Sequence, residues 1–119
     1  MDKKFYITTP IYYPSAKPHM GHAYSSIIAD FFARFKRMDG FDVQFLTGTG
    51  EHGLKIQRSA EKQNIDPLEF CNQISQTFRD LSKTLNLTNT DFIRTTEERH
   101  KKTVQHLWNE LEKNDDIYL

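Results

Sequence analysis

The N-terminal part of the chain places a strand-like run, a long helical pattern and a second strand-like run in immediate succession. The first run is FYIT, at residues 5–8. Apolar residues then recur at spacings of three and four over residues 23–38, as in a helix with a wide apolar face, and Gly40 ends it. The second run covers residues 42–48. Connections of this kind are nearly always right-handed, so the pattern predicts a βαβ unit with parallel strands.

A loop that contains glycine follows each of these predicted strands. The first loop includes KPHMGH, residues 17–22, and leads into a helix expected to start near Gly21, while the second holds Gly48, Gly50 and Gly53. The carboxyl ends of parallel strands lie at one edge of the sheet, where open α/β sheets bind ligands. The predicted fold class is therefore α/β, a parallel sheet flanked by helices with a ligand site at these loops.

The rest of the chain predicts three more helices and one more strand. A short helix is expected over residues 54–63, and a longer one begins after Asp66, a good N-cap. Residues 92–95 resemble a short strand. Thr95 and Glu98 have the spacing of a capping box and predict the start of a last helix.

Apolar residues also predict which helix faces pack. The single cysteine, Cys71, lies on an apolar helix face and is expected to be part of the core. The last helix is expected to run through His100, Val104, Leu107, Trp108 and Leu111.

Length and charge exclude some classes of function. The 119 residues suffice for one small domain with one core, and 16 basic residues balance 16 acidic ones. Nucleic-acid-binding domains normally carry a basic excess, so we expect the main RNA contacts to lie elsewhere. No apolar run reaches the ~20 residues of a membrane span, and the N-terminus resembles neither a signal nor a transit peptide, so we expect a cytoplasmic protein without membrane contact.

The first loop has the chemistry of an anion site. A helix N-terminus presents backbone N–H groups and the positive end of the helix dipole. His19 and His22 can donate hydrogen bonds to phosphate oxygens, more strongly when protonated. Gly21 would let a phosphate or a flat ring approach the backbone. Ordinary surface or capping histidines are the alternative; no metal site is predicted, because His52 and Cys71 lack zinc-like spacing.

HMGH resembles the HIGH signature of class I aminoacyl-tRNA synthetases, and it lies where that family has it, between the first strand and the first helix. The longer segment FYITTPIYYPSAKPHMGHAYSSIIADFFARFKRMDGFDVQFLTGTGEHGLKI is similar to the N-terminal catalytic segment of bacterial and organellar methionyl-tRNA synthetases. The similarity continues, less specifically, to Leu119.

The resemblance implies the N-terminal half of a Rossmann-like catalytic domain over residues 1–119. A connective insertion would begin near residues 115–119. The KMSKS half of the fold, the anticodon-binding domain and any zinc knuckle of the insertion would lie outside this chain, which alone is predicted to be inactive.

The resemblance also implies a reaction and its residues. Methionine would be activated with ATP, accompanied by Mg²⁺, to methionyl-adenylate and transferred to tRNA(Met). His19 and His22 match the histidines that contact ATP and stabilise its α-phosphate during attack by the methionine carboxylate, and Gly21 would lie under the nucleotide. Ile11 and Tyr13 match positions that line the methionine side-chain pocket.

One position departs from the family pattern. The family commonly reads TGTDEHG, with an aspartate that accepts a hydrogen bond from the substrate amino group, whereas this chain has Gly50 there. A buried ammonium without an acceptor costs about 1 to 3 kcal/mol. We expect Glu51 or a backbone carbonyl near Thr49 to supply the acceptor, and His52 to help shape the methionine-binding loop or to have a structural role only.

Two alternatives stay open. The first is another class I synthetase, for leucine, isoleucine, valine or cysteine, or a small nucleotidyltransferase with the same histidine motif. The second is a truncated, non-catalytic paralogue that binds nucleotides. Amino-acid-dependent exchange of pyrophosphate into ATP separates the enzymes from one another, and a KMSKS-like loop in the natural open reading frame would exclude the non-catalytic paralogue.

Overall fold

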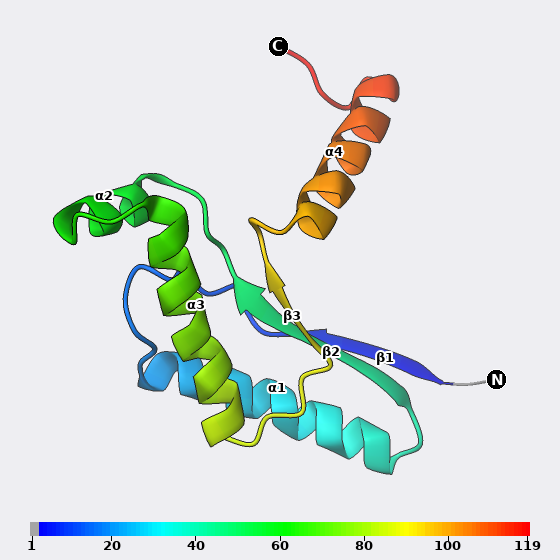
Figure 1. Cartoon of the computed structure of the whole chain (residues 1–119). Coiled ribbons are helices and arrows are strands. Elements are labelled where there is room, and N and C mark those ends of the chain that lie inside the picture. The colour runs from blue at the N-terminus through cyan, green and yellow to red at the C-terminus, as the bar shows by residue number, and fades with distance from the viewer. Residues whose placement is uncertain (1–2) are drawn as a thin grey trace.

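A computed structural model describes residues 3–119 as a three-stranded parallel sheet with four helices (Figure 1). The sheet order is β1-β2-β3, and the strands are β1 (Lys4–Thr8), β2 (Asp42–Thr49) and β3 (Asp91–Arg94). The helices are α1 (Met20–Met38), α2 (Leu54–Lys62), α3 (Pro67–Thr84) and α4 (Glu98–Lys113). Both the predicted βαβ unit and the predicted α/β fold class are confirmed.

The β2–β3 pairing depends on a glycine. Thr47 pairs with Phe92 and Gly48 with Ile93. A Cβ on Gly48 would lie 1.9 Å from the carbonyl oxygen of Ile93, so no larger residue fits without moving β3. Gly48 therefore belongs to the strand, as the predicted run over residues 42–48 indicated, and the loop that follows begins at Gly50.

Helix α1 packs on the sheet through small residues. Ala29 and Ala33 are buried against Val43 and Phe45 of β2, and their short side chains allow close approach of helix and sheet. The large apolar residues of α1 that the sequence pattern grouped on one face therefore do not form its contact with the sheet. Its large residues are at least 41% exposed: Tyr24, Ile27, Ile28, Phe31, Phe32, Phe35 and Met38.

The remaining buried apolar side chains form two further clusters, so the predicted single core is divided. One cluster joins α2 to α3 and contains Ile56, Ala60, Phe70 and Cys71. Cys71 is 1% exposed, which confirms its predicted place in the core. Burial raises the pKa of its thiol to about 11, with a smaller contribution from the negative charge of Glu51.

The third cluster connects the sheet to its flanking elements. Tyr12, in the loop after β1, packs with Phe78 of α3 and Phe92 of β3. It therefore holds the loop that precedes α1 against the rest of the molecule.

The two predicted helix starts have different outcomes. Oδ1 of Asp66 accepts hydrogen bonds from the backbone N–H groups of Leu68 and Glu69, which confirms it as the N-cap of α3. The capping box at Thr95 was wrong, because α4 begins after Glu97, which makes no side-chain cap bond. The hydroxyl of Thr95 instead accepts from the backbone N–H of Glu51, 2.7 Å away.

Helix α4 extends away from the sheet (Figure 1). None of its residues is buried, and Val104, Leu107 and Trp108 are 49 to 58% exposed. The large apolar side chains of this helix are therefore not part of the core formed within residues 3–119. No helix in that range is both long and apolar enough to cross a membrane.

Candidate functional site

The two histidines of the KPHMGH loop cap the N-terminus of α1. Nδ1 of His19 accepts a hydrogen bond from the backbone N–H of Gly21, at 3.0 Å. Nδ1 of His22 accepts one from the backbone N–H of His19, also at 3.0 Å. The pair forms a capping box in which imidazoles replace the usual hydroxyl and carboxylate side chains.

This cap determines which ring nitrogens can meet a ligand. Because Nδ1 of each ring accepts a hydrogen bond, each neutral histidine carries its proton on Nε2. The ring centroids of His19 and His22 lie 3.9 Å apart, so the two imidazoles are direct neighbours. Burial, and secondarily the neighbouring His19, lower the pKa of His22. This shift favours the neutral form of His22, whose ring still carries an N–H donor.

Gly21 is required by the cap itself. A Cβ at this position would lie 2.9 Å from Cε1 and 3.1 Å from Nδ1 of His19. The missing side chain at Gly21 therefore makes room for the imidazole of His19.

Tyr12 holds the first turn of α1 against the sheet, a role that the sequence did not predict. Its hydroxyl lies 2.9 Å from Oγ of Ser26 and donates to the carbonyl of His22 at 3.2 Å. Its backbone continues the β2 pairing, since its N–H donates to Gly48 and its carbonyl accepts from Gly50. Its ring is packed edge-on against the imidazole of His22, with 4.8 Å between centroids.

A cavity of about 410 Å³ lies beside the histidine cap. His19, His22, Ile11 and Tyr13 line it, so the structure brings together four of the predicted site residues. The same cavity is lined by Lys55, at the start of α2, which the sequence analysis did not select. Its position directly after the glycine-bearing second loop was the available signal.

Gly50 lies close to one wall of this cavity. A Cβ at Gly50 would stand 3.6 Å from Cδ1 and Cγ1 of Ile11, an ordinary van der Waals distance. The backbone of Gly50 is held by a 2.8 Å hydrogen bond to the carbonyl of Tyr12. Gly50 and Ile11 are therefore neighbours, although they lie far apart in the sequence.

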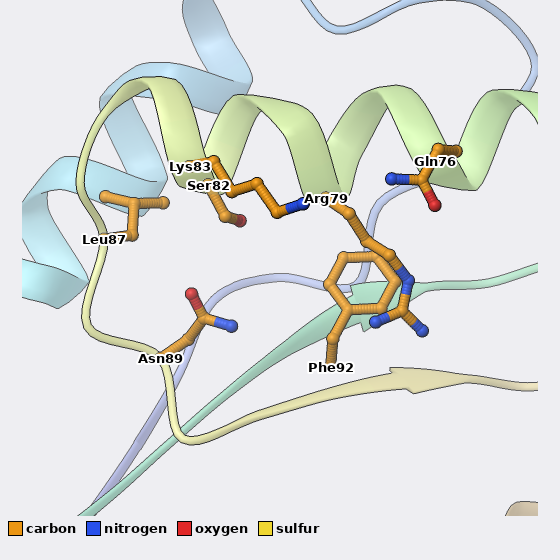
Figure 2. Close-up of a pocket in the computed structure, with 7 residues that line it drawn as sticks. All are labelled: Gln76, Arg79, Ser82, Lys83, Leu87, Asn89 and Phe92. Atoms are coloured by element: carbon orange, nitrogen blue, oxygen red, sulfur yellow. The ribbon is translucent and has the colours of Figure 1, made fainter.

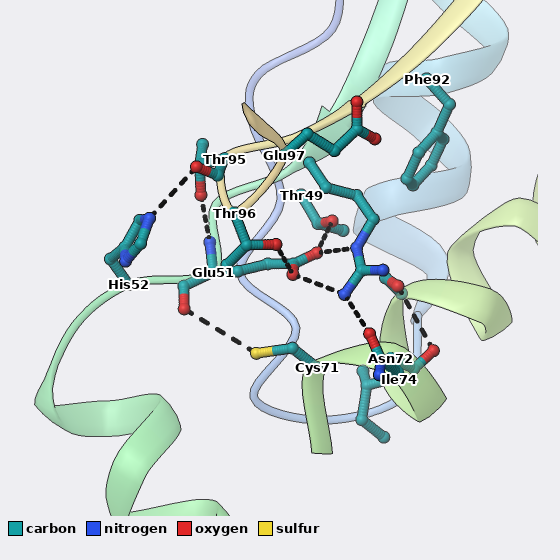
Figure 3. Close-up of polar contacts among 12 residues, drawn as sticks. Thr49, Glu51, His52, Cys71, Asn72, Ile74, Phe92, Thr95, Thr96 and Glu97 are labelled. Atoms are coloured by element: carbon teal, nitrogen blue, oxygen red, sulfur yellow. Dashed lines mark hydrogen bonds and ion pairs between the residues drawn. The ribbon is translucent and has the colours of Figure 1, made fainter. Parts of the chain in front are cut away.

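The carboxylate of Glu51 lies in a buried ionic network (Figure 3). Arg94 donates from Nε to Oε2 at 2.7 Å and from Nη2 to Oε1 at 2.8 Å. The hydroxyls of Thr49 and Thr96 donate to the same two oxygens, at 2.7 and 2.8 Å. Burial alone would raise the pKa of Glu51, but the hydrogen bonds from Arg94 and the threonines outweigh it and the pKa is lowered.

These contacts limit whether Glu51 can accept a hydrogen bond from the substrate amino group, which was one of the two expectations from the sequence. With both carboxylate oxygens engaged and its side chain fully buried, Glu51 presents no accessible acceptor to the cavity. His52 is exposed and its Nε2 lies 3.2 Å from the carbonyl of Thr95. This contact joins the loop after β2 to the turn before α4, in keeping with the loop-shaping alternative for His52.

A second cavity, of about 360 Å³, lies between α3 and β3 and is lined by neither His19 nor His22 (Figure 2). The guanidinium of Arg79 stacks over the ring of Phe92, 4.3 Å from its centroid. None of the predicted site residues lines this cavity.

Carboxylates and other metal ligands do not gather at either cavity. Within residues 3–119, no three His, Cys, Asp or Glu side chains are grouped so as to hold a metal ion. The cavity lined by His19 and His22, which we call the histidine cavity, has hydrogen-bond donors and cationic side chains in its lining and no carboxylate.

The fold and the site together define a class. A helix N-terminus with two imidazole donors, at the carboxyl edge of a parallel sheet, is the arrangement of a Rossmann-like nucleotide-binding protein. The family model described as tRNA synthetases class I (M) matches residues 5–119. The chain belongs to this family, as its sequence motifs suggested.

Individual relatives agree with the family. Methionine–tRNA ligase of Bacillus subtilis is 54% identical over 115 residues, which cover 97% of this chain and 17% of the relative. The Rickettsia conorii protein of the same name is 53% identical, covering 99% and 23%. A crystal structure of Mycobacterium tuberculosis methionyl-tRNA synthetase bound by methionyl-adenylate matches with a TM-score of 0.95 and 43% identity, covering 98% of this chain and 23% of that one.

The chain thus spans about a fifth of the length of the curated relatives that it matches. It is similar to the N-terminal part of the catalytic domain of these enzymes, which confirms the resemblance read from the sequence.

Proposed function

We propose that the natural full-length protein activates methionine with ATP, forming methionyl-adenylate and pyrophosphate, and transfers the methionyl group to tRNA(Met). The observation that carries the proposal is the pair of Nε2–H donors of His19 and His22 beside a cavity at the N-terminus of α1. Relatives named methionine–tRNA ligase support the choice of amino acid.

The chemical step needs charge stabilisation rather than a covalent intermediate. A carboxylate oxygen of methionine attacks the α-phosphorus, and the bond to the oxygen that bridges to the β-phosphate breaks. His19 and His22 would donate Nε2–H hydrogen bonds to the phosphate oxygens on which negative charge increases. Because the cap fixes both rings before the substrate binds, little reorganisation is needed in the transition state.

Magnesium would enter with the nucleotide. The residues that line the histidine cavity include no carboxylate, so phosphate oxygens of ATP would supply the ligands that Mg²⁺ prefers. Mg²⁺ would neutralise part of the polyphosphate charge, and the histidines would position the α-phosphate.

Methionine would bind beside Ile11 and Tyr13, which are 47% and 62% exposed and line the same cavity. Because the ionic network occupies the carboxylate of Glu51, the substrate amino group would instead donate to a backbone carbonyl near Thr49. Gly50 would permit close approach of the amino group, and Glu51 and His52 would hold the loop in shape.

Residues 1–119 would then form the N-terminal portion of the catalytic domain. We expect the connective insertion to begin near residues 115–119, and the KMSKS half and the anticodon-binding domain to be supplied by other parts of the full-length protein. A protein expressed as residues 1–119 alone is expected to be inactive in the exchange assay.

Amino-acid-dependent exchange of labelled pyrophosphate into ATP tests the proposal. The full-length protein should catalyse exchange with methionine and not with leucine, isoleucine, valine or cysteine. His22→Asn keeps an acceptor oxygen at the position of Nδ1 but removes the ring Nε2–H donor, and should slow exchange about 100-fold. His106→Asn, on exposed α4, is the matched control and should exchange normally. Exchange with another amino acid and none with methionine would overturn the proposal.

A further inference from the structure

Two lysines line the histidine cavity without taking part in its internal hydrogen bonds. Lys17 belongs to the loop before α1, and Lys55 to the first turn of α2. In the part of the chain that the structure describes, neither ammonium group forms an ion pair with a carboxylate. Two different elements therefore bring an uncompensated positive charge to one cavity.

The charge of this cavity is one-sided. Its lining residues include two lysines and two histidines but no aspartate or glutamate, although the chain as a whole has no net charge. Cations in one cavity repel one another, and a multivalent anion removes that repulsion. The imbalance thus selects an anion with several charges.

The start of α2 strengthens the same preference. Its N-cap is Gly53, which has no side chain to bond the first N–H groups, and its first turn contains no acidic residue. An acidic side chain is normally favourable at this position, because it compensates the helix dipole. Here the dipole and Lys55 act with the same sign at the cavity.

We propose that Lys17 and Lys55 bind the β- and γ-phosphates of ATP and hold pyrophosphate as it leaves. This inference rests on the proposed function, which places the α-phosphate at His19 and His22. When the carboxylate attacks, the electron pair of the breaking bond passes to pyrophosphate, and the two ammonium groups stabilise that charge. The histidines and the lysines would then bind different parts of one triphosphate.

Binding of inorganic tripolyphosphate, measured by calorimetry on the full-length protein without metal, tests the proposal. Lys17→Gln and Lys55→Gln should each weaken tripolyphosphate binding about tenfold and change AMP binding less than twofold. Lys62→Gln, at the far end of α2 and outside the cavity, is the matched control and should bind as the parent does.

Three results would overturn the proposal. The first is unchanged tripolyphosphate affinity in both cavity variants, and the second is an equal loss of AMP affinity, which would indicate a general charge effect. The third is a change confined to the KM for tRNA, which would assign the lysines to RNA. Failure of the proposed function is a separate result: lysine-dependent tripolyphosphate binding in a protein that performs no methionine-dependent exchange.

Discussion

Arg94 of β3 binds both carboxylate oxygens of Glu51, with its Nε 2.7 Å from Oε2 and its Nη2 2.8 Å from Oε1 (Figure 3). The carboxylate has no solvent exposure, and the Arg94 side chain is 19% exposed. Arg94 also donates to Oδ1 of Asn72 on α3 at 2.7 Å. One ion pair therefore joins the end of β2, the end of β3 and the helix that flanks them.

Removal of Arg94 should loosen this whole edge of the sheet. Arg94→Met would leave the buried carboxylate of Glu51 without its counter-charge, which costs about 3 kcal/mol or more. Hydrogen–deuterium exchange of peptides from residues 43–51 should accelerate about 100-fold in the full-length protein. A 100-fold acceleration corresponds to about 3 kcal/mol, because each tenfold change in the opening equilibrium is worth about 1.4 kcal/mol.

Arg99 offers a matched control for this experiment. It also forms a two-oxygen ion pair, with Asp91, but its side chain is 51% exposed. Exposed pairs contribute little to stability, so Arg99→Met should change the exchange of residues 43–51 little. Equal effects of the two substitutions would show that burial of the Glu51 pair contributes nothing.

Local patterns predicted the elements and the histidine site. Strand runs, helical spacing and the Asp66 cap depend on neighbours in sequence, and the structure agrees with each. His19 and His22 were found for the same reason, since a helix N-terminus is a local feature. The capping role of both rings was weighed only as the simpler alternative, and the structure shows that both rings cap the helix.

Contacts between distant residues were the part that could not be predicted. Glu51 and Arg94 are 43 residues apart, and nothing in the sequence indicates that they pair. That fold-level contact also draws the Thr95 hydroxyl to the Glu51 amide, which is why the predicted capping box does not form. The prediction of which face of α1 packs on the sheet was wrong for a related reason. Close approach of the helix to the sheet favours Ala29 and Ala33 over larger apolar residues.

The cap formed by His22 predicts a dependence of stability on pH. Since burial and His19 lower its pKa in the folded protein from the ordinary 6.5, the unfolded chain takes up the proton first as pH falls. The stabilisation is complete above pH 6.5 and decreases below it, toward the lower folded pKa. The unfolding temperature of the full-length protein should therefore fall more between about pH 7.5 and about pH 5.5 than that of His22→Gln, which cannot titrate. Parallel curves would contradict this assignment.

Gly21→Ala should separate stability from activity. Alanine favours the helix by about 1 kcal/mol, but its Cβ would displace the ring of His19, and a lost N-cap costs about 1 kcal/mol. The two effects nearly cancel, so the unfolding temperature should change little. Pyrophosphate exchange should nevertheless fall at least tenfold, because the Nε2 donor of His19 is moved.

Gly40→Ala is the opposite case and serves as the comparison for Gly21. Gly40 has a φ of +79°, which an alanine adopts only with strain, and it lies at the other end of α1 with open space around it. The substitution should lower the unfolding temperature and leave the exchange rate per folded molecule unchanged. An active Gly21→Ala variant would remove His19 from the proposed chemistry.

Gly50→Asp tests whether the substrate ammonium lacks a charged acceptor. A Cβ at this position would stand 3.6 Å from Ile11, which lines the histidine cavity, so a side chain fits there. A hydrogen bond to a charged group contributes about 1.5 kcal/mol or more, so the KM for methionine should fall about tenfold. Gly50→Asn has nearly the same shape without the charge and should lower KM much less. If neither variant changes KM, the backbone carbonyls near Thr49 already satisfy the ammonium, and the glycine at this position has no cost for methionine binding.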